Sequence, residues 1–415
     1  MTARDPVNDS CALQVIGAGP AGMSLVLALC NRVADATVAN SAEQRLLDSM
    51  AMIEASAGAG GKMASYRVNA NTSAHDVVRG IADGTPFVGI RDAYLHHPQT
   101  QSSLIPLADI GRLMVEPLAQ AIREYLGERL RCGIEVSHIE IEPRGFASFD
   151  ATGALIQRSE QLVLCCGARE QPLPELTSLE DRWEGSGRFL LRSDLDGLSG
   201  ERRPIVIVGG SHSAFSCAWR LLFDPLFSEF ARDRDIVLLQ RRERIKLRCT
   251  REFAEANGVE FDPDTDVCPI SGLVFRNGGL RKDAKQLYLD IRDGRETRVR
   301  ILQMERLADQ QALLERAALI LQATGFVSNL PRIECGGRPL EVGNPGANGE
   351  LHDLADDSVI PGLYGMGLGL NILPADAQGE PSFHGGIHGF QSYPLTIAPR
   401  LIDCLTAQMA VENLP

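Results

Sequence analysis

The chain has 415 residues, of which 44% are hydrophobic and 23% charged, and its formal net charge is −13. This length exceeds one ordinary core and predicts two domains, and the composition is typical of a soluble globular protein. Two Trp, six Tyr and the negative net charge argue against a nucleic-acid partner, which needs clustered Lys and Arg. The same charge mildly favours a cationic substrate, although net charge says little about one pocket.

The sequence shows no membrane or export signal. No apolar run reaches the roughly 18 residues of a spanning helix, and the N-terminus lacks the pattern of a signal peptide. The ten cysteines are scattered, without C-x-x-C or a metal-type cluster, so no metal site is predicted. A cytoplasmic protein with reduced thiols and no membrane partner is expected. Whether it forms a homo-oligomer is left open.

The first motif is a glycine-rich turn between an expected strand at 13–16 and an expected helix at 23–29. Its candidate cofactor-binding residues, in the spacing G-x-G-x-x-G, are Gly17, Gly19, Pro20, Ala21 and Gly22. The three glycines allow a tight turn, the approach of a pyrophosphate and close helix–strand packing. The helix N-terminus attracts the phosphates. A turn without a ligand is the alternative interpretation.

Two candidates follow this turn. Glu54 ends the next expected strand, at 49–53, where an acid binds ribose hydroxyls. It comes later than the usual spacing of about 20 residues, so 35–48 is interpreted as an insertion. The alternative is a surface charge. The glycine-rich segment 57–62 makes Lys62 a candidate cofactor contact, and an ordinary loop is an equal alternative.

The region that follows carries fewer motifs. Residues 66–100 predict long loops and short helices, and 62–130 is expected to face a substrate. The apolar spacing over 107–126 predicts an amphipathic helix. A strand at 134–141 and its hairpin partner at 146–155 come next.

Leu162–Arg169, LVLCCGAR, predicts a buried strand that ends at Gly167, where a cofactor can approach the backbone closely. The adjacent Cys165 and Cys166 are interpreted as buried apolar residues, because the ring that a vicinal disulfide closes is strained.

A second unit has expected strands at 205–208 and 236–239 around a helix. Its turn contains the candidates Gly209, Ser211, His212, Ser213 and Ala214. Ser211 replaces the middle glycine, which puts the closest backbone approach in doubt. Arg241 and Arg242 stand where an acid would repel a 2′-phosphate, so NADP(H) is favoured over NAD(H). The alternative is a solvated basic run.

The C-terminal third adds further candidates. A buried strand is expected to end at Ala323, Thr324 and Gly325, and Gly365, Gly367 and Gly369 give another loop of close approach. Gly389 precedes a final helix whose N-terminus would face a flavin ring.

Together these motifs resemble the two-dinucleotide-binding-domain flavoproteins, most of all the flavin-dependent N-hydroxylating and related class B monooxygenases. The residues that carry the resemblance are Gly17, Gly19, Pro20, Gly22 and Glu54 for FAD, Gly209, Ser213, Ala214 and Arg241 for NADPH, and the ATGF segment at 323–326. The resemblance implies an α/β fold of two Rossmann-like domains. An NADP-binding domain at 196–312 would be inserted between two parts of an FAD-binding domain, 1–195 and 313–415.

The resemblance also implies an activity. NADPH would reduce FAD, and a flavin C4a-hydroperoxide formed with O2 would pass oxygen to a small-molecule amine or another heteroatom, in biosynthesis. No catalytic side chain is nominated. One alternative is a hydride-only reductase of the pyridine-nucleotide–disulfide type, which normally needs a dithiol that this sequence lacks near the flavin. The other is a nucleotide-sensing flavoprotein without turnover, favoured only by Ser211.

Overall fold

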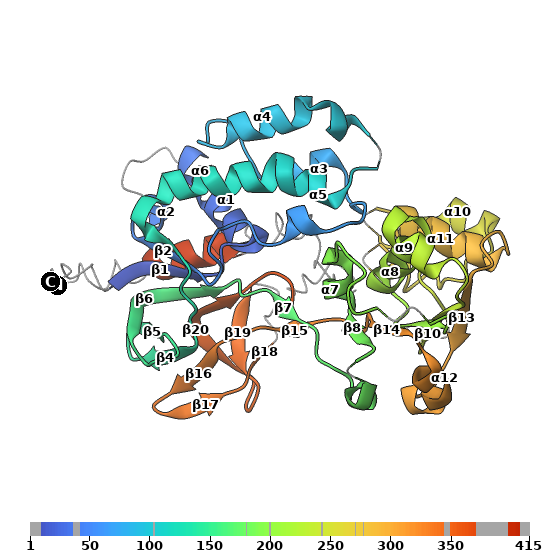
Figure 1. Cartoon of the computed structure of the whole chain (residues 1–415). Coiled ribbons are helices and arrows are strands. Elements are labelled where there is room, and N and C mark those ends of the chain that lie inside the picture. Colours follow the sequence, from blue (N-terminus) through green and yellow to red (C-terminus); the bar gives the residue numbers. More distant parts are fainter. Residues whose placement is uncertain are drawn as a thin grey trace, which may run out of the picture.

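The computed structural model describes residues 10–35, 42–102, 104–179, 181–198, 201–241, 244–269, 271–276, 278–343, 349–370 and 397–406. Two separate sheets lie side by side, each with helices packed against it (Figure 1). The predicted α/β fold with two Rossmann-like halves is therefore confirmed. Over the described residues, no helix combines the length and the apolar character needed to cross a membrane.

The first sheet has a parallel centre that continues into antiparallel strands. The parallel strands, in spatial order, are β3 (Leu130–Cys132), β2 (Met50–Glu54), β1 (Ser10–Ile16), β6 (Leu155–Leu164) and β20 (Ser358–Gly365). The antiparallel part contains β4 (His138–Glu142), β5 (Gly145–Phe149), β17 (Arg338–Leu340), β18 (Val342–Gly343) and β19 (Glu350–Asp353), together with β16 (Arg332–Cys335), which pairs parallel to β4. The long β6 joins both parts, because its first half pairs with β5 and its second half with β20.

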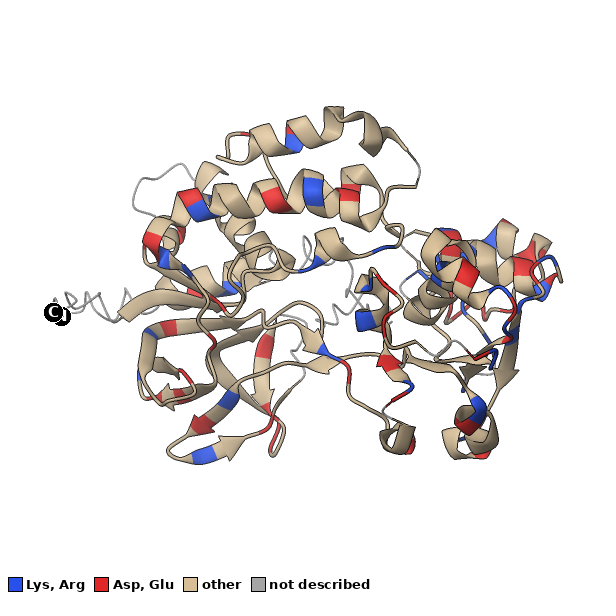
Figure 2. Cartoon of the chain, in the orientation of Figure 1, with Lys and Arg blue, Asp and Glu red and all other residues tan. Residues whose placement is uncertain are grey.

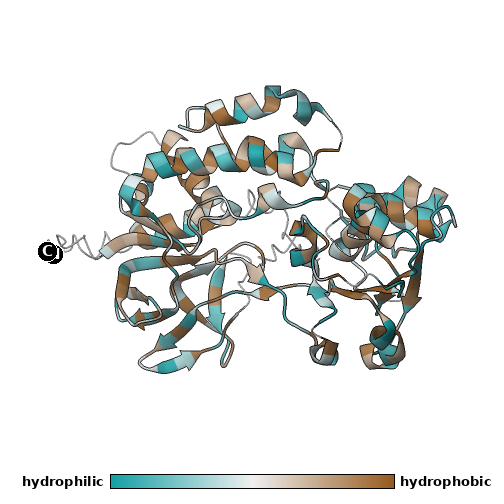
Figure 3. Cartoon of the chain, viewed as in Figure 1, coloured by the Kyte–Doolittle hydropathy of each residue, from teal (hydrophilic) through white to brown (hydrophobic). Residues whose placement is uncertain are grey.

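Helices cover one face of this sheet. They are α1 (Pro20–Asp35), α2 (Ala42–Asp48), α3 (Ala74–Val78), α4 (Val88–His96), α5 (Leu107–Ile110) and α6 (Glu116–Leu126), with short helices η1 (Met63–Ser65), η2 (Pro98–Gln101) and η4 (Gly127–Arg129). The predicted helix over 107–126 is confirmed, with a π-helical turn, η3 (Gly111–Val115), in its middle. Hydrophobic and hydrophilic residues alternate along it, as an amphipathic helix requires (Figure 3). Gly111 is needed there because a Cβ would lie 2.3 Å from the Ala64 backbone.

The second sheet is wholly parallel. Its strands, in spatial order, are β13 (Val299–Gln303), β10 (Ile236–Gln240), β9 (Ile205–Val208), β14 (Leu319–Gln322) and β8 (Trp183–Gly185). Its helices are α7 (Ser186–Leu191), α8 (His212–Phe223), α9 (Pro225–Ala231), α10 (Arg251–Ala256), α11 (Lys282–Arg292) and α12 (Gln311–Arg316), beside η6 (Leu307–Gln310) and the small pair β11 (Cys249–Thr250) and β12 (Leu273–Val274). The sheet extends beyond 196–312 at both ends, because β8 and β14 complete it.

Every residue of β9, Ile-Val-Ile-Val, is buried, as expected of a central strand with helices on both faces. Charged residues of both signs gather on the surrounding helices, and the strands carry fewer (Figure 2). The hydrophobic core is accordingly divided between the two faces of this sheet, with α8 on one face and α12 near the other.

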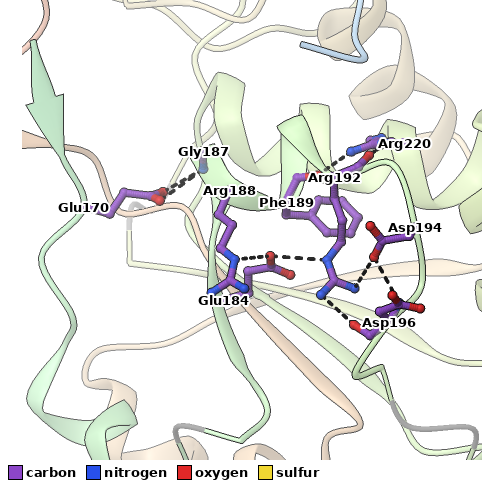
Figure 4. Close-up of polar contacts among 9 residues, drawn as sticks. All are labelled: Glu170, Glu184, Gly187, Arg188, Phe189, Arg192, Asp194, Asp196 and Arg220. Carbon is purple, nitrogen blue, oxygen red and sulfur yellow. Dashed lines mark hydrogen bonds and ion pairs between the residues drawn. The ribbon is translucent and has the colours of Figure 1, made fainter. Parts of the chain in front are cut away.

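Two crossings connect the halves, and they pair with each other as β7 (Ala168–Arg169) and β15 (Val327–Ser328). Beyond β7, Glu170 accepts hydrogen bonds from Ser186 Oγ (2.5 Å) and Gly187 N (3.1 Å) at the start of α7. Figure 4 shows the contact with Gly187. Burial raises the pKa of Glu170. The η5 helix (Pro174–Leu179) lies along the same connection. These contacts fix α7 beside the crossing.

Candidate functional site

The first glycine-rich turn is held by backbone contacts that leave no room for side chains. Gly17 has φ +105°, and a Cβ there would lie 2.2 Å from the carbonyl oxygen of Cys165. A Cβ on Gly22 would lie 2.1 Å from the Gly17 carbonyl oxygen. By contrast, a Cβ on Gly19 would meet nothing within 4 Å. The turn is therefore closed towards the sheet and open at Gly19, where α1 begins, which fits the approach of a pyrophosphate.

Glu54 closes the rim of this turn. Its Oε2 accepts the Ala18 N–H at 2.7 Å, and its Oε1 accepts the Ser56 N–H at 2.8 Å. Gly60 N donates to the Ala18 carbonyl at 2.8 Å, which draws the glycine-rich segment before Lys62 over the same turn. The carboxylate at the end of β2 thus lies beside the start of α1, the place where a ribose would need it.

The second turn repeats the first contact for contact. Gly209 has φ +144°, and a Cβ there would lie 2.3 Å from the Ala323 carbonyl oxygen. Gly209 N donates to the Leu239 carbonyl, and Gly17 N donates to the Ile53 carbonyl, both at 2.8 Å. Ala323 N donates to the Val208 carbonyl at 2.8 Å. The ATG segment therefore supports the second turn, as Cys165 supports the first.

The rim of the second turn differs from that of the first. Ser211 is the N-cap of α8, with φ −125° and ψ −171°, an extended conformation that any residue adopts. Gln240 ends β10 and its buried Oε1 has no hydrogen-bond partner among the described residues. Arg241 follows it and is exposed. Arg242 lies outside the described residues.

One cavity of about 910 Å³ lies between the two halves. The predicted site residues that line it are Gly17, Gly19, Pro20, Ala21, Glu54, Lys62, Gly167, His212 and Ser213. The first turn and the first turn of α8 therefore face one space. A cavity shared by two halves is a usual place for a ligand.

The other predicted residues lie elsewhere. Gly22, Gly209, Ala214, Ala323, Thr324 and Gly325 are not among the lining residues, and neither are Ser211 and Arg241. Gly365 was predicted to contact a cofactor, but a Cβ there would meet Leu351 and Leu370 side chains at 2.8 Å. Gly367, φ +98°, from the same predicted loop, lines the cavity, because β20 ends at Gly365 and the turn comes after it. Gly389 lies outside the described residues.

The adjacent cysteines both line the cavity, and neither is in a disulfide. Cys165 is buried and Cys166 is partly buried. Burial raises the pKa of Cys166 to about 12 and also raises that of Cys165. Since the thiolate is the reactive form, these cysteines are poorly suited to dithiol exchange at neutral pH. The prediction of buried cysteines is confirmed for Cys165, whereas Cys166 is partly buried.

The cavity wall also includes residues that no motif revealed. From the first half come Tyr66, Asn69 and Asn71, and from the second half Trp219, Arg281, Lys282 and Asp283. Asn69 Nδ2 donates to Asp283 Oδ2 at 2.6 Å, and Lys282 Nζ donates to the Thr72 carbonyl at 3.0 Å. These two bonds hold the halves together across the cavity. The residues come from segments with little periodicity, so only their place in 62–130 signalled a role for some of them.

His212 begins α8 at the cavity wall. Burial, assisted by the charge of Arg281, lowers its pKa to about 4, against a partial opposing effect of the Gly279 backbone. Its Nε2 is buried without a hydrogen-bond partner among the described residues. A neutral imidazole thus stands at the N-terminus of α8.

Known proteins are similar to this chain in sequence and in fold over nearly its whole length. No protein-family profile matches the chain. A CMP-5′-(3-aminopropyl)phosphonate hydroxylase from Streptomyces rubellomurinus is 26% identical over 97% of this chain and 99% of its own. A monooxygenase from Paecilomyces divaricatus is 23% identical over 94% and 97%.

Two solved structures show how widely the fold is used. The ornithine hydroxylase of Pseudomonas aeruginosa superposes with a TM-score of 0.60 at 14% identity, over 95% of this chain and 100% of its own. A bacillithiol disulfide reductase from Staphylococcus aureus superposes with a TM-score of 0.51 at 10% identity, over 95% and 99%. The predicted resemblance is confirmed: in sequence this chain is similar to a hydroxylase and a monooxygenase, and it has the fold of the flavin monooxygenases.

Proposed function

We propose that this chain is an FAD- and NADPH-dependent monooxygenase that adds one oxygen atom of O2 to the nitrogen of a small-molecule amine. The net reaction consumes the amine, O2, NADPH and a proton, and it yields the hydroxylated amine, NADP⁺ and water. When bound, FAD would supply the hydride acceptor and the activation of O2. The single observation that carries the proposal is the cavity at which both glycine-rich turns meet.

The residues of the first turn fit FAD. Gly19 leaves open space before α1 for the pyrophosphate, and Glu54 lies where the ribose hydroxyls would be. Lys62 and Gly167 line the same cavity and would contact the ring system. The adjoining walls from 66–71 would hold the substrate and keep water from the reacting atoms.

The residues of the second turn fit NADPH. The first turn of α8, whose residues His212 and Ser213 line the cavity, would bind its pyrophosphate. The exposed Arg241 would bind the 2′-phosphate at the far end of the nucleotide. Because this turn faces the same cavity, a nicotinamide bound here would lie against the flavin.

A hydride-only reductase is the competing function, since a disulfide reductase has the same fold. The raised pKa of Cys165 and Cys166 disfavours the dithiol version of that chemistry. The similarity to two oxygenases over nearly the whole chain also favours oxygen transfer.

The test is to supply the FAD-loaded protein with NADPH, ¹⁸O₂ and a panel of primary amines, including amines that carry a phosphonate. We expect one amine to stimulate NADPH oxidation and to gain a single ¹⁸O atom, with little hydrogen peroxide released. If every amine leaves the rate unchanged, and all consumed NADPH appears as peroxide or as a reduced quinone, oxygen transfer is refuted and the reductase stands.

A further inference from the structure

Arg281 and Lys282 place two positive charges on one wall of the cavity, although the chain as a whole carries −13. Arg281 lies immediately before α11. Burial, and after it the charges of Arg248 and Arg276, lowers the pKa of Arg281 to about 10. Arg248 and Arg276 are near Arg281 but do not line the cavity themselves. We name Arg248, Arg276 and Arg281 the arginine cluster.

The arginine cluster is not neutralised within the part of the chain that the structure describes. There, none of its three guanidinium groups has a carboxylate oxygen within 4.0 Å. Arg281 Nη2 donates to the Arg276 carbonyl at 2.9 Å, and the buried Nε of Arg248 has no hydrogen-bond partner among the described residues. Asp76 is the acid whose charge acts on both Arg248 and Arg281, and its effect is smaller than that of burial and of the neighbouring arginines.

Unlike the arginine cluster, Arg244 and Lys246 lie beside a carboxylate. Arg244 forms an ion pair with Asp266 at 2.8 Å, and Lys246 lies 4.0 Å from the same carboxylate. Asp283, an acid of the cavity wall next to Lys282, accepts a hydrogen bond from Asn69. Holding three like charges together with no acid in ion-pair contact is unfavourable, and a bound anion would reduce that cost.

We propose that the arginine cluster binds a phosphate or phosphonate group of the substrate, so that the amine is presented on a phosphate-bearing molecule. This inference rests on the proposed function, because it assumes that the cavity holds the amine. The planar fork of arginine matches phosphate oxygens in pairs, which gives orientation as well as affinity. Anchored by its phosphate beside Arg281, the substrate would extend along the wall formed by Asn69 and Asn71 towards the first turn.

NADPH also carries phosphates, so the assay must separate the two sources. The probe is CMP, with cytidine as the counterpart that lacks only the phosphate. CMP is titrated calorimetrically into the FAD-loaded protein saturated with NADP⁺. We expect CMP to bind while NADP⁺ is present, and cytidine to bind at least tenfold more weakly. If NADP⁺ displaces CMP, or if cytidine binds equally well, the substrate subsite is refuted.

Variants then locate the site. Arg281→Gln is expected to weaken CMP binding at least tenfold, and Arg281→Lys to restore part of it, since it keeps the charge but loses the fork. The matched control is Arg295→Gln, which removes the same charge from an exposed residue paired with Asp290 and Asp293. Equal CMP affinity in Arg281→Gln and Arg295→Gln would overturn the assignment.

Two further outcomes are a variant that does not fold and a result that supports only one of the two proposals. Should Arg281→Gln fail to fold, competition settles the question in the unaltered protein: inorganic phosphate must displace CMP, and failure to do so refutes the subsite. Because these measurements follow binding, CMP affinity of the expected kind without an oxygenated amine would reject the proposed function alone. Oxygen transfer without phosphate-dependent CMP binding would reject the subsite alone.

Discussion

The two glycine-rich turns share one backbone plan and differ at their rims. In each, the first glycine has a positive φ and lies against a carbonyl oxygen from the end of a neighbouring parallel strand. The sheets match as well, since β3-β2-β1-β6-β20 corresponds in order to β13-β10-β9-β14-β8. At the rim, however, the first turn has Glu54 and the second has Gln240 and Arg241. Steric demands fix the framework of both turns, and the side chains at the strand ends are where we expect the choice of nucleotide to be made.

The largest expected effects come from breaking each framework in turn. In Gly17→Ala the new Cβ would lie 2.2 Å from a carbonyl oxygen, so we expect a protein that holds no FAD and purifies colourless. In Gly209→Ala the corresponding distance is 2.3 Å, but we expect FAD to remain and reduction by NADPH to fail. Flavin absorbance and anaerobic reduction by NADPH and by dithionite measure both results.

Gly153→Ala controls for backbone strain alone, because Gly153 has φ +82° in a hairpin and nothing within 4 Å of a Cβ. This variant should retain FAD and NADPH turnover. If Gly209→Ala loses FAD as completely as Gly17→Ala, the two turns do not serve separate nucleotides.

The next largest effect tests the rim of the second turn. Arg241→Ala should raise the KM for NADPH by about 10- to 100-fold, since charged hydrogen bonds contribute about 1.5–3 kcal/mol. The KM for NADH should stay nearly constant, because NADH has no 2′-phosphate. Arg300→Ala, which removes an exposed arginine 3.6 Å from Asp235, is the control. Equal changes for both nucleotides would show that Arg241 does not read the 2′-phosphate.

The stability of the second turn should depend on pH, and that of the first should not. The reason is that α8 begins with the titratable His212, whereas α1 begins with Pro20. The pKa of His212 is about 4 when folded, against a reference of 6.5, so the unfolded chain binds more protons between these values. The stabilisation is complete above pH 6.5 and is lost as the pH falls towards 4. Between about pH 7.5 and pH 5 it corresponds to about 2 kcal/mol.

Urea unfolding of the wild type and of His212→Gln at these two pH values measures this effect. The wild type should lose more stability than the variant on acidification, by about the same 2 kcal/mol. Identical losses in the two proteins would mean that His212 is not held neutral at the start of α8.

Local patterns predicted the frameworks of both turns, and long-range pairing decided what the patterns left open. The strand at 205–208 was predicted with its observed bounds, because four consecutive β-branched residues followed by glycines have few other interpretations. The motif that begins at Ala323 was recognised in the sequence. The strand before it, β14, pairs with β9, and nothing within the motif predicts that pairing.

Most residues of the cavity wall could not be predicted from local sequence patterns either, because long-range packing brings them to the site. Arg281 and Lys282 follow a glycine turn in a region that the sequence marked only as short strands and Gly turns. They reach the site because the start of α11 packs against 69–72, where Lys282 donates to the Thr72 carbonyl and Asp283 accepts from Asn69. Gly365 and Gly367 stand in one glycine-rich run, and the sequence does not distinguish their roles. Only the end of β20 decides which of the two packs against leucines and which faces the cavity.

The smallest expected effect concerns Ser211, the departure from the motif that favoured a non-catalytic protein. Because Ser211 is extended at φ −125°, glycine is not required there, and Ser211→Gly adds only flexibility, worth about 0.5–1 kcal/mol. We therefore expect the KM for NADPH to change less than about fivefold, measured as NADPH oxidation with the wild type in parallel. A gain of tenfold or more in turnover would mean instead that the serine blocks the nucleotide. In that case the second turn of the natural protein would sense a nucleotide and would not support hydride transfer. The similar backbone of the two turns would then not mean that both bind a nucleotide for catalysis.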